Sequence, residues 1–250
     1  MKLYSEQELL QLNHRDLEKT FNNYLGNKHR NVCDKQSFLL EWVDPQKNET
    51  ILECGSSSGK TCVDFANKSG CNMIGIDFDP DAIEVSARMQ KKYFPELDAR
   101  CIFRKDDLAQ MFFDRKIKKI IMPDFTEHIT NEVFSGILNN MKQLQDVKLY
   151  IYTPAGTHIF EILRHRNIIL KKIMNHINVK TENEMVRFLE ENGWKVVERK
   201  WRPSHLPVIR IFEILFGNFP LVGKYFHRKM AIMATPDHVS SKNGRDRGIL

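Results

Sequence analysis

The sequence predicts an α/β fold with a mostly parallel sheet of seven strands and helices on both faces. Three observations support this prediction. From Thr50 onward, short apolar runs rich in β-branched residues alternate with longer segments of helical periodicity. The first two apolar runs lead into residues typical of strand ends, Gly55 and Asp77. The chain has 250 residues, 42% of them hydrophobic and 28% charged, which suits one globular domain with a large core.

Seven segments have the length and composition of strands. They are residues 50–54, 72–77, 99–104, 118–122, 147–152, 194–200 and 228–235. Four helical segments lie between them, at residues 59–68, 80–94, 130–143 and 181–192. Strands separated by helices pair in parallel through right-handed crossovers. A long segment joins the last two strands, and we expect these two to form an antiparallel edge.

Residues 1–48 predict a helical cap. Ser5 and Glu8 have the spacing of a capping box, and apolar residues follow them at helical spacing. A second helical segment, 32–43, stops just before Pro45 because the residue ahead of a proline is disfavoured in a helix. We expect this cap to pack on the main domain or to form a lid over its pocket.

An apolar insertion and a basic tail follow the core. Residues 201–227 form a predicted lid insertion between the last two strands, and the part 205–227 is rich in Phe, Ile and Leu. Three interpretations stay open: a helix that covers the sheet, a lid over an apolar acceptor, or a patch that rests on a membrane surface. Residues 237–250 have too little apolar content to pack. We therefore expect a disordered tail after one domain that spans residues 1–236.

Composition limits the partners and the compartment. The net charge of +6 is compatible with a polyanionic partner, but much of the excess lies in the last third and the tail, which disfavours nucleic acid. The apolar runs are too short to span a bilayer, and the acidic N-terminus does not resemble a secretory signal. Five cysteines without a CxxC pair favour reduced thiols in a cytoplasm. No metal is predicted, because the late histidines lack short ligand spacing: His158, His165, His176 and His205.

The turn after the first strand opens a predicted cofactor-binding core, residues 49–200. Gly55 allows a sharp turn, and Gly59 allows a ligand to approach the backbone as the helix begins. Ser57 between them is small. Glu53 places a charge where the pattern predicts core, so we expect it to have a partner, such as a ligand amino group.

Acidic residues end the next two strands. Asp77 lies where a carboxylate accepts hydrogen bonds from ribose hydroxyls, and Phe78 beside it could lie against adenine. Asp106 and Asp107 end the third strand, where a carboxylate can accept from the adenine amino group. Together with the glycine turn, these residues predict a pocket for a nucleoside.

These residues resemble the motifs of Rossmann-like, or class I, S-adenosylmethionine-dependent methyltransferases. The glycine-rich motif of that family reads acidic-x-Gly-x-Gly-x-Gly, and Glu53 to Gly59 matches it with Ser57 at the middle glycine. The match tolerates Ser57 if its backbone angle is ordinary. The stretch 75–88 matches the second motif of the family closely. The resemblance implies a Rossmann-like fold and S-adenosyl-L-methionine as cofactor.

The turn after the fourth strand is expected beside the transferred methyl group. Glu127-His128-Ile129 resembles a turn of the ubiquinone-biosynthesis O-methyltransferase type. His128 is the leading candidate for a base or for orienting the acceptor, with a helix cap as its structural alternative. His158, after the fifth strand, is a second candidate base. Asp124 is expected to help hold the methionine end of the cofactor.

The sequence thus predicts an enzyme that methylates an oxygen or nitrogen of a small-molecule acceptor and releases S-adenosylhomocysteine. One alternative is an RNA or other nucleic-acid methyltransferase. It lacks support because the Asp/Asn-Pro-Pro-Tyr/Phe turn is missing and no cysteine nucleophile follows Cys101. A second alternative is a non-catalytic sensor or scaffold that binds the cofactor. Nucleotide sites of other kinds are disfavoured, because a complete phosphate-binding loop and a Gly-x-Gly-x-x-Gly motif are both absent from the sequence.

Overall fold

The computed structural model describes residues 17–26, 30–144, 146–165, 173, 175–204, 207–219 and 222–237. Within these ranges seven strands form one sheet: β1 (Thr50–Cys54), β2 (Asn72–Asp77), β3 (Cys101–Lys105), β4 (Ile117–Pro123), β5 (Lys148–Pro154), β6 (Trp194–Arg202) and β7 (Lys229–Pro236). The α-helices are α2 (Leu17–Leu25), α3 (Arg30–Val43), α4 (Lys60–Ser69), α5 (Pro80–Tyr93), α6 (Asn131–Met141), α7 (Ile159–His165), α8 (Glu182–Glu191) and α9 (Pro207–Gly217). Short 3₁₀ helices are η1 (Pro95–Leu97), η2 (Thr126–His128) and η3 (Gly223–Phe226).

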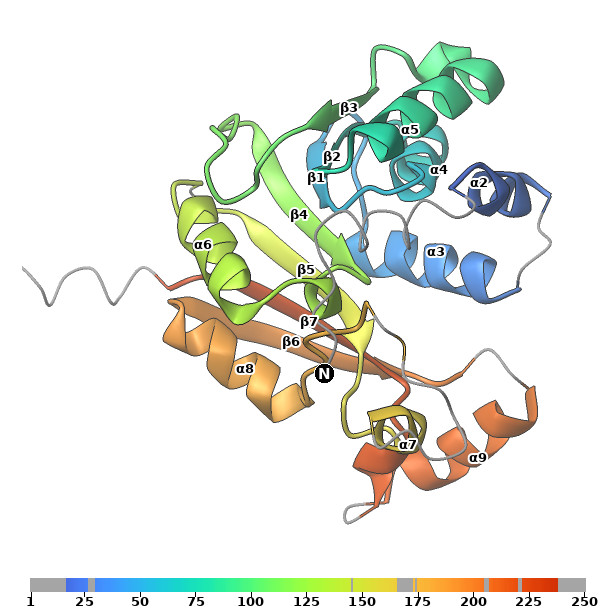
Figure 1. The fold of residues 1–250 in the computed structure, drawn as a ribbon, viewed down its shortest axis with the longest axis vertical. Coiled ribbons are helices and arrows are strands. Elements are labelled where there is room, and N and C mark those ends of the chain that lie inside the picture. The colour runs from blue at the N-terminus through green and yellow to red at the C-terminus, as the bar shows by residue number, and fades with distance from the viewer. Residues whose placement is uncertain are drawn as a thin grey trace, which may run out of the picture.

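The sheet has the strand order β3-β2-β1-β4-β5-β7-β6 (Figure 1). The first five strands pair in parallel, so their carboxyl ends share one edge. The order of the strands along the sheet reverses between β1 and β4, with β2 and β3 on one side and β5 on the other. In open α/β sheets such a reversal is where ligands bind. The seven-stranded, mostly parallel α/β fold predicted from the sequence is confirmed.

Two apolar cores cover the two faces of the sheet because successive side chains of a strand point to opposite sides. One core lies under α6 and α8 and includes Phe134, Leu189 and Trp194. The other lies under α2, α3 and α4 and includes Phe21 and Phe65. Figure 1 shows these two helical layers on either side of the strands.

The described part of the N-terminal region forms one of these layers. In α3, Trp42 packs edge-on against Tyr150 with ring centroids 5.1 Å apart, and Phe38 lies 5.7 Å from Tyr152. Helix α3 is therefore part of the core, and it also sends Lys35 toward the carboxyl edge of the sheet. The capping box predicted at Ser5 and Glu8 lies outside the described residues, as do residues 238–250 of the predicted tail.

Strand β7 is inserted between β5 and β6 and pairs antiparallel with both. The predicted antiparallel character is present, but only β7 runs against the sheet, while β6 forms the edge. The antiparallel direction of β7 has a consequence for the site. Because β7 begins where β5 ends, Lys229 pairs with Pro154 at the carboxyl edge.

The described part of the apolar insertion does not cover a face of the sheet. Helix α9 lies beyond the end of the strands beside α7 (Figure 1). The inner side of α9 packs closely against Trp201 at Gly217, because an added Cβ there would lie 2.9 Å from Cη2 of Trp201. Among the described residues, no helix is long and apolar enough to cross a membrane.

Candidate functional site

The turn between β1 and α4 adopts a left-handed backbone at three positions. The φ angles are 69° at Gly55, 49° at Ser57 and 76° at Gly59. The sequence argument tolerated Ser57 on the condition of an ordinary angle, and that condition is not met. The backbone amide of Ser57 donates to Oδ2 of Asp77 at 2.8 Å, which offsets part of the cost of this conformation.

Close packing explains why both glycines lack a side chain. A Cβ on Gly55 would lie 2.5 Å from Cδ2 of Phe125, and one on Gly59 would lie 2.6 Å from Cβ of Ser86. Ser56 and Ser58 are buried in this turn, and within the described part of the chain their hydroxyls have no hydrogen-bond partner. A buried polar group without a partner is costly, so these hydroxyls suit a polar ligand.

Glu53 has the partner that its burial requires. The residue is 2% exposed, and the Cys62 thiol donates to its Oε2 at 3.0 Å. Burial raises the pKa of the Glu53 carboxyl, whereas the Cys62 hydrogen bond and the Lys60 charge act to lower it. Burial and the Lys35 charge lower the pKa of Lys60 to about 8. This end of the site therefore holds a carboxylate between basic groups.

Asp77 stands at the tip of β2 as predicted. Its carboxylate accepts from the backbone amides of Ser57 and, at 3.1 Å, of Asp79. Burial raises the pKa of Asp77, while these amide hydrogen bonds act to lower it. Phe78 beside it is 50% exposed, so its ring is free to receive a planar ligand.

Asp106 and Asp107 follow β3, one strand further along the sheet. The amide of Asp106 donates to the carbonyl of Asp77 at 3.3 Å, which places the two strand ends side by side. The carboxylates of Asp106 and Asp107 accept from the amides of Asp107 and Ala109, both at 2.9 Å. The predicted adenosine side of the pocket is thus brought together at one edge.

Asp124, directly after β4, is held by two lysines from distant segments. Lys35 of α3 binds Oδ2 at 2.7 Å, and Lys229 at the start of β7 binds Oδ1. Burial alone would raise the pKa of Asp124, but Lys229 and Lys35 hold it well below its usual range. Asp124 therefore anchors α3 and β7 to the sheet edge, whereas the sequence predicted a direct role at the methionine end of the cofactor. Neither lysine was found by sequence reasoning.

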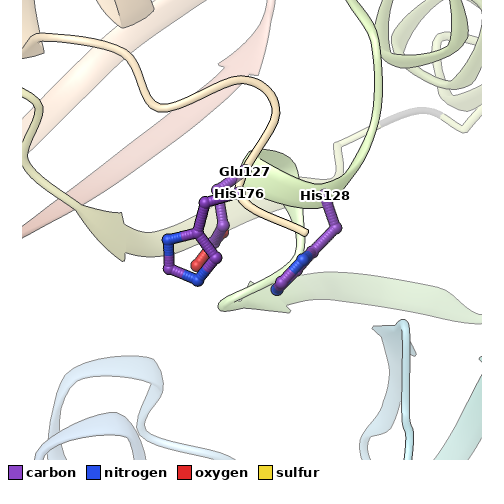
Figure 2. A group of neighbouring side chains, drawn as sticks. All are labelled: Glu127, His128 and His176. Atoms are coloured by element: carbon purple, nitrogen blue, oxygen red, sulfur yellow. The ribbon is translucent and has the colours of Figure 1, made fainter. Parts of the chain in front are cut away.

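Glu127 and His128 lie in η2 beside a third residue, His176, from the loop before α8. Figure 2 shows the three side chains facing one another. Glu127 is 1% exposed, and its Oε2 accepts from the Thr153 hydroxyl at 2.9 Å. Burial and the Asp124 charge raise the pKa of Glu127. Burial and neighbouring His128 lower the pKa of His176 to about 4, so this ring is neutral at pH 7.

His158 follows β5 as predicted, but its side chain is buried and paired within the protein. It is 1% exposed, and its Nε2 lies 2.8 Å from Oε1 of Glu213 in α9. Its Nδ1 accepts from the backbone amide of Phe160 at 3.2 Å. Both ring nitrogens are therefore engaged within the protein. His158 fastens α9 to the start of α7 and does not offer a nitrogen to an acceptor, which corrects its assignment as a second base.

These contacts fit the cofactor implied by the sequence motifs. Asp77 and Phe78 would hold the ribose and the adenine, Asp106 and Asp107 would meet the adenine edge, and the glycine turn would pass beneath. The buried Ser56 and Ser58 hydroxyls and the Glu53 carboxylate lie in or before the same turn. The fold and the site fit a nucleoside-binding α/β enzyme.

Comparison with known proteins gives the same answer. The profile of a family described as a methyltransferase domain matches residues 24–199. The chain belongs to this family, and it is an enzyme that takes its methyl group from S-adenosylmethionine. None of the curated proteins matches the chain.

Several solved structures are similar in fold. A geranyl diphosphate C-methyltransferase from Streptomyces coelicolor A3(2) has a TM-score of 0.58 at 13% identity, over 82% of this chain and 79% of that chain. The magnesium protoporphyrin IX methyltransferase from Synechocystis PCC 6803 has a TM-score of 0.55 at 14% identity, over 94% and 88%. A putative methyltransferase in complex with the Haloferax volcanii Trm112 activator has a TM-score of 0.62 at 12% identity, over 95% and 100%. At these identities the likeness establishes the fold alone.

Proposed function

We propose that this methyltransferase transfers the methyl group to an oxygen or nitrogen of a small-molecule acceptor. One observation carries the proposal: three distant segments enclose the turn after β4. Helix α3 reaches it through Lys35 and β7 through Lys229, both on Asp124. The loop before α8 reaches it through the amide of Ile177, which donates to the Glu127 carbonyl at 2.9 Å. An enclosed edge favours a small acceptor over a nucleic-acid strand.

The chemistry asks little of individual side chains. When bound, the cofactor supplies an electrophilic methyl group on a sulfonium that is already a good leaving group. The chain must align the acceptor with that group and exclude water. His128 stands on the turn where the acceptor is expected, and its Nδ1 lies 2.9 Å from the Asn175 carbonyl, which fixes the ring. We propose that His128 orients the acceptor or takes its proton.

Binding of S-adenosylhomocysteine tests the cofactor side. The product should raise the Tm of the wild-type chain because it binds only the folded state. Asp77→Ala should lose most of this shift, whereas Asp98→Ala, which removes an exposed carboxylate before β3, should keep it. Equal shifts in the two variants would contradict the assignment of Asp77.

An acceptor screen tests the substrate side. Release of S-adenosylhomocysteine would be measured with phenols, other hydroxylated compounds, amines and a mixed RNA pool. Turnover with a small molecule, lost in His128→Ala, is the expected result. Methylation of RNA with binding that weakens steeply as salt increases would replace the proposal with the nucleic-acid alternative. Cofactor binding without turnover on any class would favour a sensor.

The outer face of α9 suggests where an apolar acceptor enters. Its exposed side chains are Val208, Ile211, Phe212, Ile214 and Leu215. The opposite side is fixed by Glu213, so this apolar face points away from the protein. We propose that the segment 205–227 acts as a lid that rests on a membrane surface. Phe212→Asp should reduce cosedimentation with anionic lipid vesicles, and Val133→Asp, at an exposed position of α6, should not. Equal cosedimentation would contradict this role.

A further inference from the structure

We propose that Glu127, His128 and His176 bind one divalent metal ion of the zinc type. Each residue offers one ligand atom, and these atoms all lie within 4.8 Å of one another. Glu127 and His128 are neighbours on η2, and His176 comes from the loop before α8 (Figure 2). The sequence argument did not reach this group, because it sought short spacing among the late histidines and did not pair any of them with His128.

Two donor atoms of the cluster lack the partners that burial demands. The Oε1 atom of Glu127 is buried and has no hydrogen bond within the described residues, although Oε2 accepts from Thr153. In the same part of the chain, Nδ1 of His176 is also buried without a partner. Leaving a buried carboxylate oxygen unpaired is costly, and a cation between the two groups removes that cost.

The surrounding contacts orient the cluster as they do in known metal sites. The Nδ1 atom of His128 lies 2.9 Å from the Asn175 carbonyl, so Nε2 is the nitrogen left for a ligand. Metal-binding histidines almost always donate their other nitrogen to such an acceptor. The amides of Ile177 and Asn178 donate to the Glu127 carbonyl at 2.9 and 3.1 Å. These bonds hold the segment that carries His176 against η2.

The donor set selects the kind of ion. Two imidazoles and one carboxylate suit zinc and its neighbours in the first transition series, whereas magnesium prefers oxygen ligands throughout. Zinc at about 2.0–2.2 Å from each donor brings tetrahedral ligand atoms to about 3.4 Å from one another. The ligand atoms of the cluster lie within 4.8 Å of one another, so the three side chains must close up around the ion as it binds. Three protein ligands leave a fourth position open, the arrangement of catalytic rather than structural zinc.

The open position gives the ion a role in the reaction, and this part of the inference rests on the proposed function. An acceptor hydroxyl bound to the ion has a lowered pKa and releases its proton to water. The resulting oxygen attacks the methyl carbon and forms the C–O bond. The C–S bond breaks, and its electron pair stays on sulfur as S-adenosylhomocysteine leaves. His128 then acts as a ligand, and the acceptor would be a hydroxyl compound.

Metal uptake by the full-length, tag-free chain tests the binding directly. After treatment with EDTA, the wild-type chain should take up about one Zn²⁺, and Co²⁺ should give intense visible bands without thiolate charge-transfer absorption. The second condition separates this site from the five free cysteines. His176→Ala and Glu127→Gln should weaken Zn²⁺ binding at least about 100-fold, because even outer-sphere changes cost 10–100-fold. His227→Gln is the control, since that ring stacks on Trp201 instead.

The outcomes are distinct. No uptake by the wild-type chain, uptake of Mg²⁺ but not Zn²⁺, thiolate absorption with Co²⁺, or full affinity in His176→Ala would each overturn the metal site. The thermal shift with S-adenosylhomocysteine is measured on every protein in parallel. A normal shift in the variants shows that they are folded. It also separates failure of the metal site from failure of the proposed function, because the cofactor residues lie on other strand ends.

Discussion

The two glycines at the ends of α4 allow backbone strain to be separated from crowding. Gly59 precedes the helix with φ 76°, and Gly70 follows it with φ 71°. A Cβ on Gly59 would lie 2.6 Å from Cβ of Ser86 and 2.7 Å from Cζ of Phe103. A Cβ on Gly70 would meet only Cγ of Lys47, at an ordinary 3.5 Å. The substitutions Gly59→Ala and Gly70→Ala therefore share one cost and differ in the other.

The magnitudes follow from these contacts. A left-handed backbone costs an alanine about 1–2 kcal/mol, and this applies at both positions. Overpacking adds about 1–3 kcal/mol at Gly59 only. The loss of unfolded-state freedom is the same for both variants and cancels in the comparison. We expect Gly59→Ala to lower the free energy of unfolding by about 2–5 kcal/mol, and Gly70→Ala by about 1–2 kcal/mol.

Urea and thermal denaturation of the two variants and the wild type measure this difference. At about 2–4 °C per kcal/mol, the extra crowding lowers Tm in Gly59→Ala by roughly 2–12 °C more than in Gly70→Ala. Gly59→Ala should also weaken S-adenosylhomocysteine binding, whereas Gly70→Ala should not, because Gly70 lies at the far end of the helix. Equal losses of stability in the two variants would refute the packing argument for the glycine turn.

Three further predictions test other contacts of the site. Glu213→Ala leaves the Nε2–H of His158 and the Ser204 amide without their acceptor, so it should destabilise the protein by about 1–3 kcal/mol per group and speed proteolysis within α9. Unchanged proteolysis would show that the contact between His158 and Glu213 does not hold the helix. Asp124 has a depressed pKa in the folded state, so its contribution is present above the unfolded carboxyl pKa of about 3.9 and is lost as pH falls below it. Wild type should therefore exceed Asp124→Asn in urea resistance most at pH 7 and progressively less below about pH 4, and a constant gap would contradict the two-lysine contact. Phe78→Ala should change the free energy of unfolding by less than about 0.5 kcal/mol. It should weaken S-adenosylhomocysteine binding, measured by calorimetry, by roughly 2–12-fold, because an aromatic contact contributes about 0.5–1.5 kcal/mol. Unchanged affinity would contradict the placement of Phe78 in the adenine site.

The sequence by itself determined the fold and the cofactor. Strand and helix periodicities are local, so the seven strands were predicted to within a few residues of their observed bounds. The residues predicted to bind the cofactor also lie at the ends of consecutive strands. Parallel pairing must bring such ends to one edge, which is why Asp77 and Asp106 could be placed together in advance.

Only the tertiary structure decided what several polar side chains do. The motif match tolerated Ser57 only on the condition of an ordinary backbone angle, but the residue is left-handed and its amide donates to the Asp77 carboxylate. His158 was predicted as a second candidate base, and only the fold shows that its Nε2 lies 2.8 Å from Oε1 of Glu213 on a distant helix.

The acceptor side depended on tertiary contacts most of all. Asp124 meets Lys35 and Lys229, and His128 meets His176, across long stretches of chain. A residue's chemical role is set by its neighbours in space. For these residues, no short-range spacing in the sequence predicts which neighbours they will have. The proposed cofactor site is built from successive strand ends and can be predicted along the chain, whereas the proposed acceptor site is assembled from segments that only folding brings together.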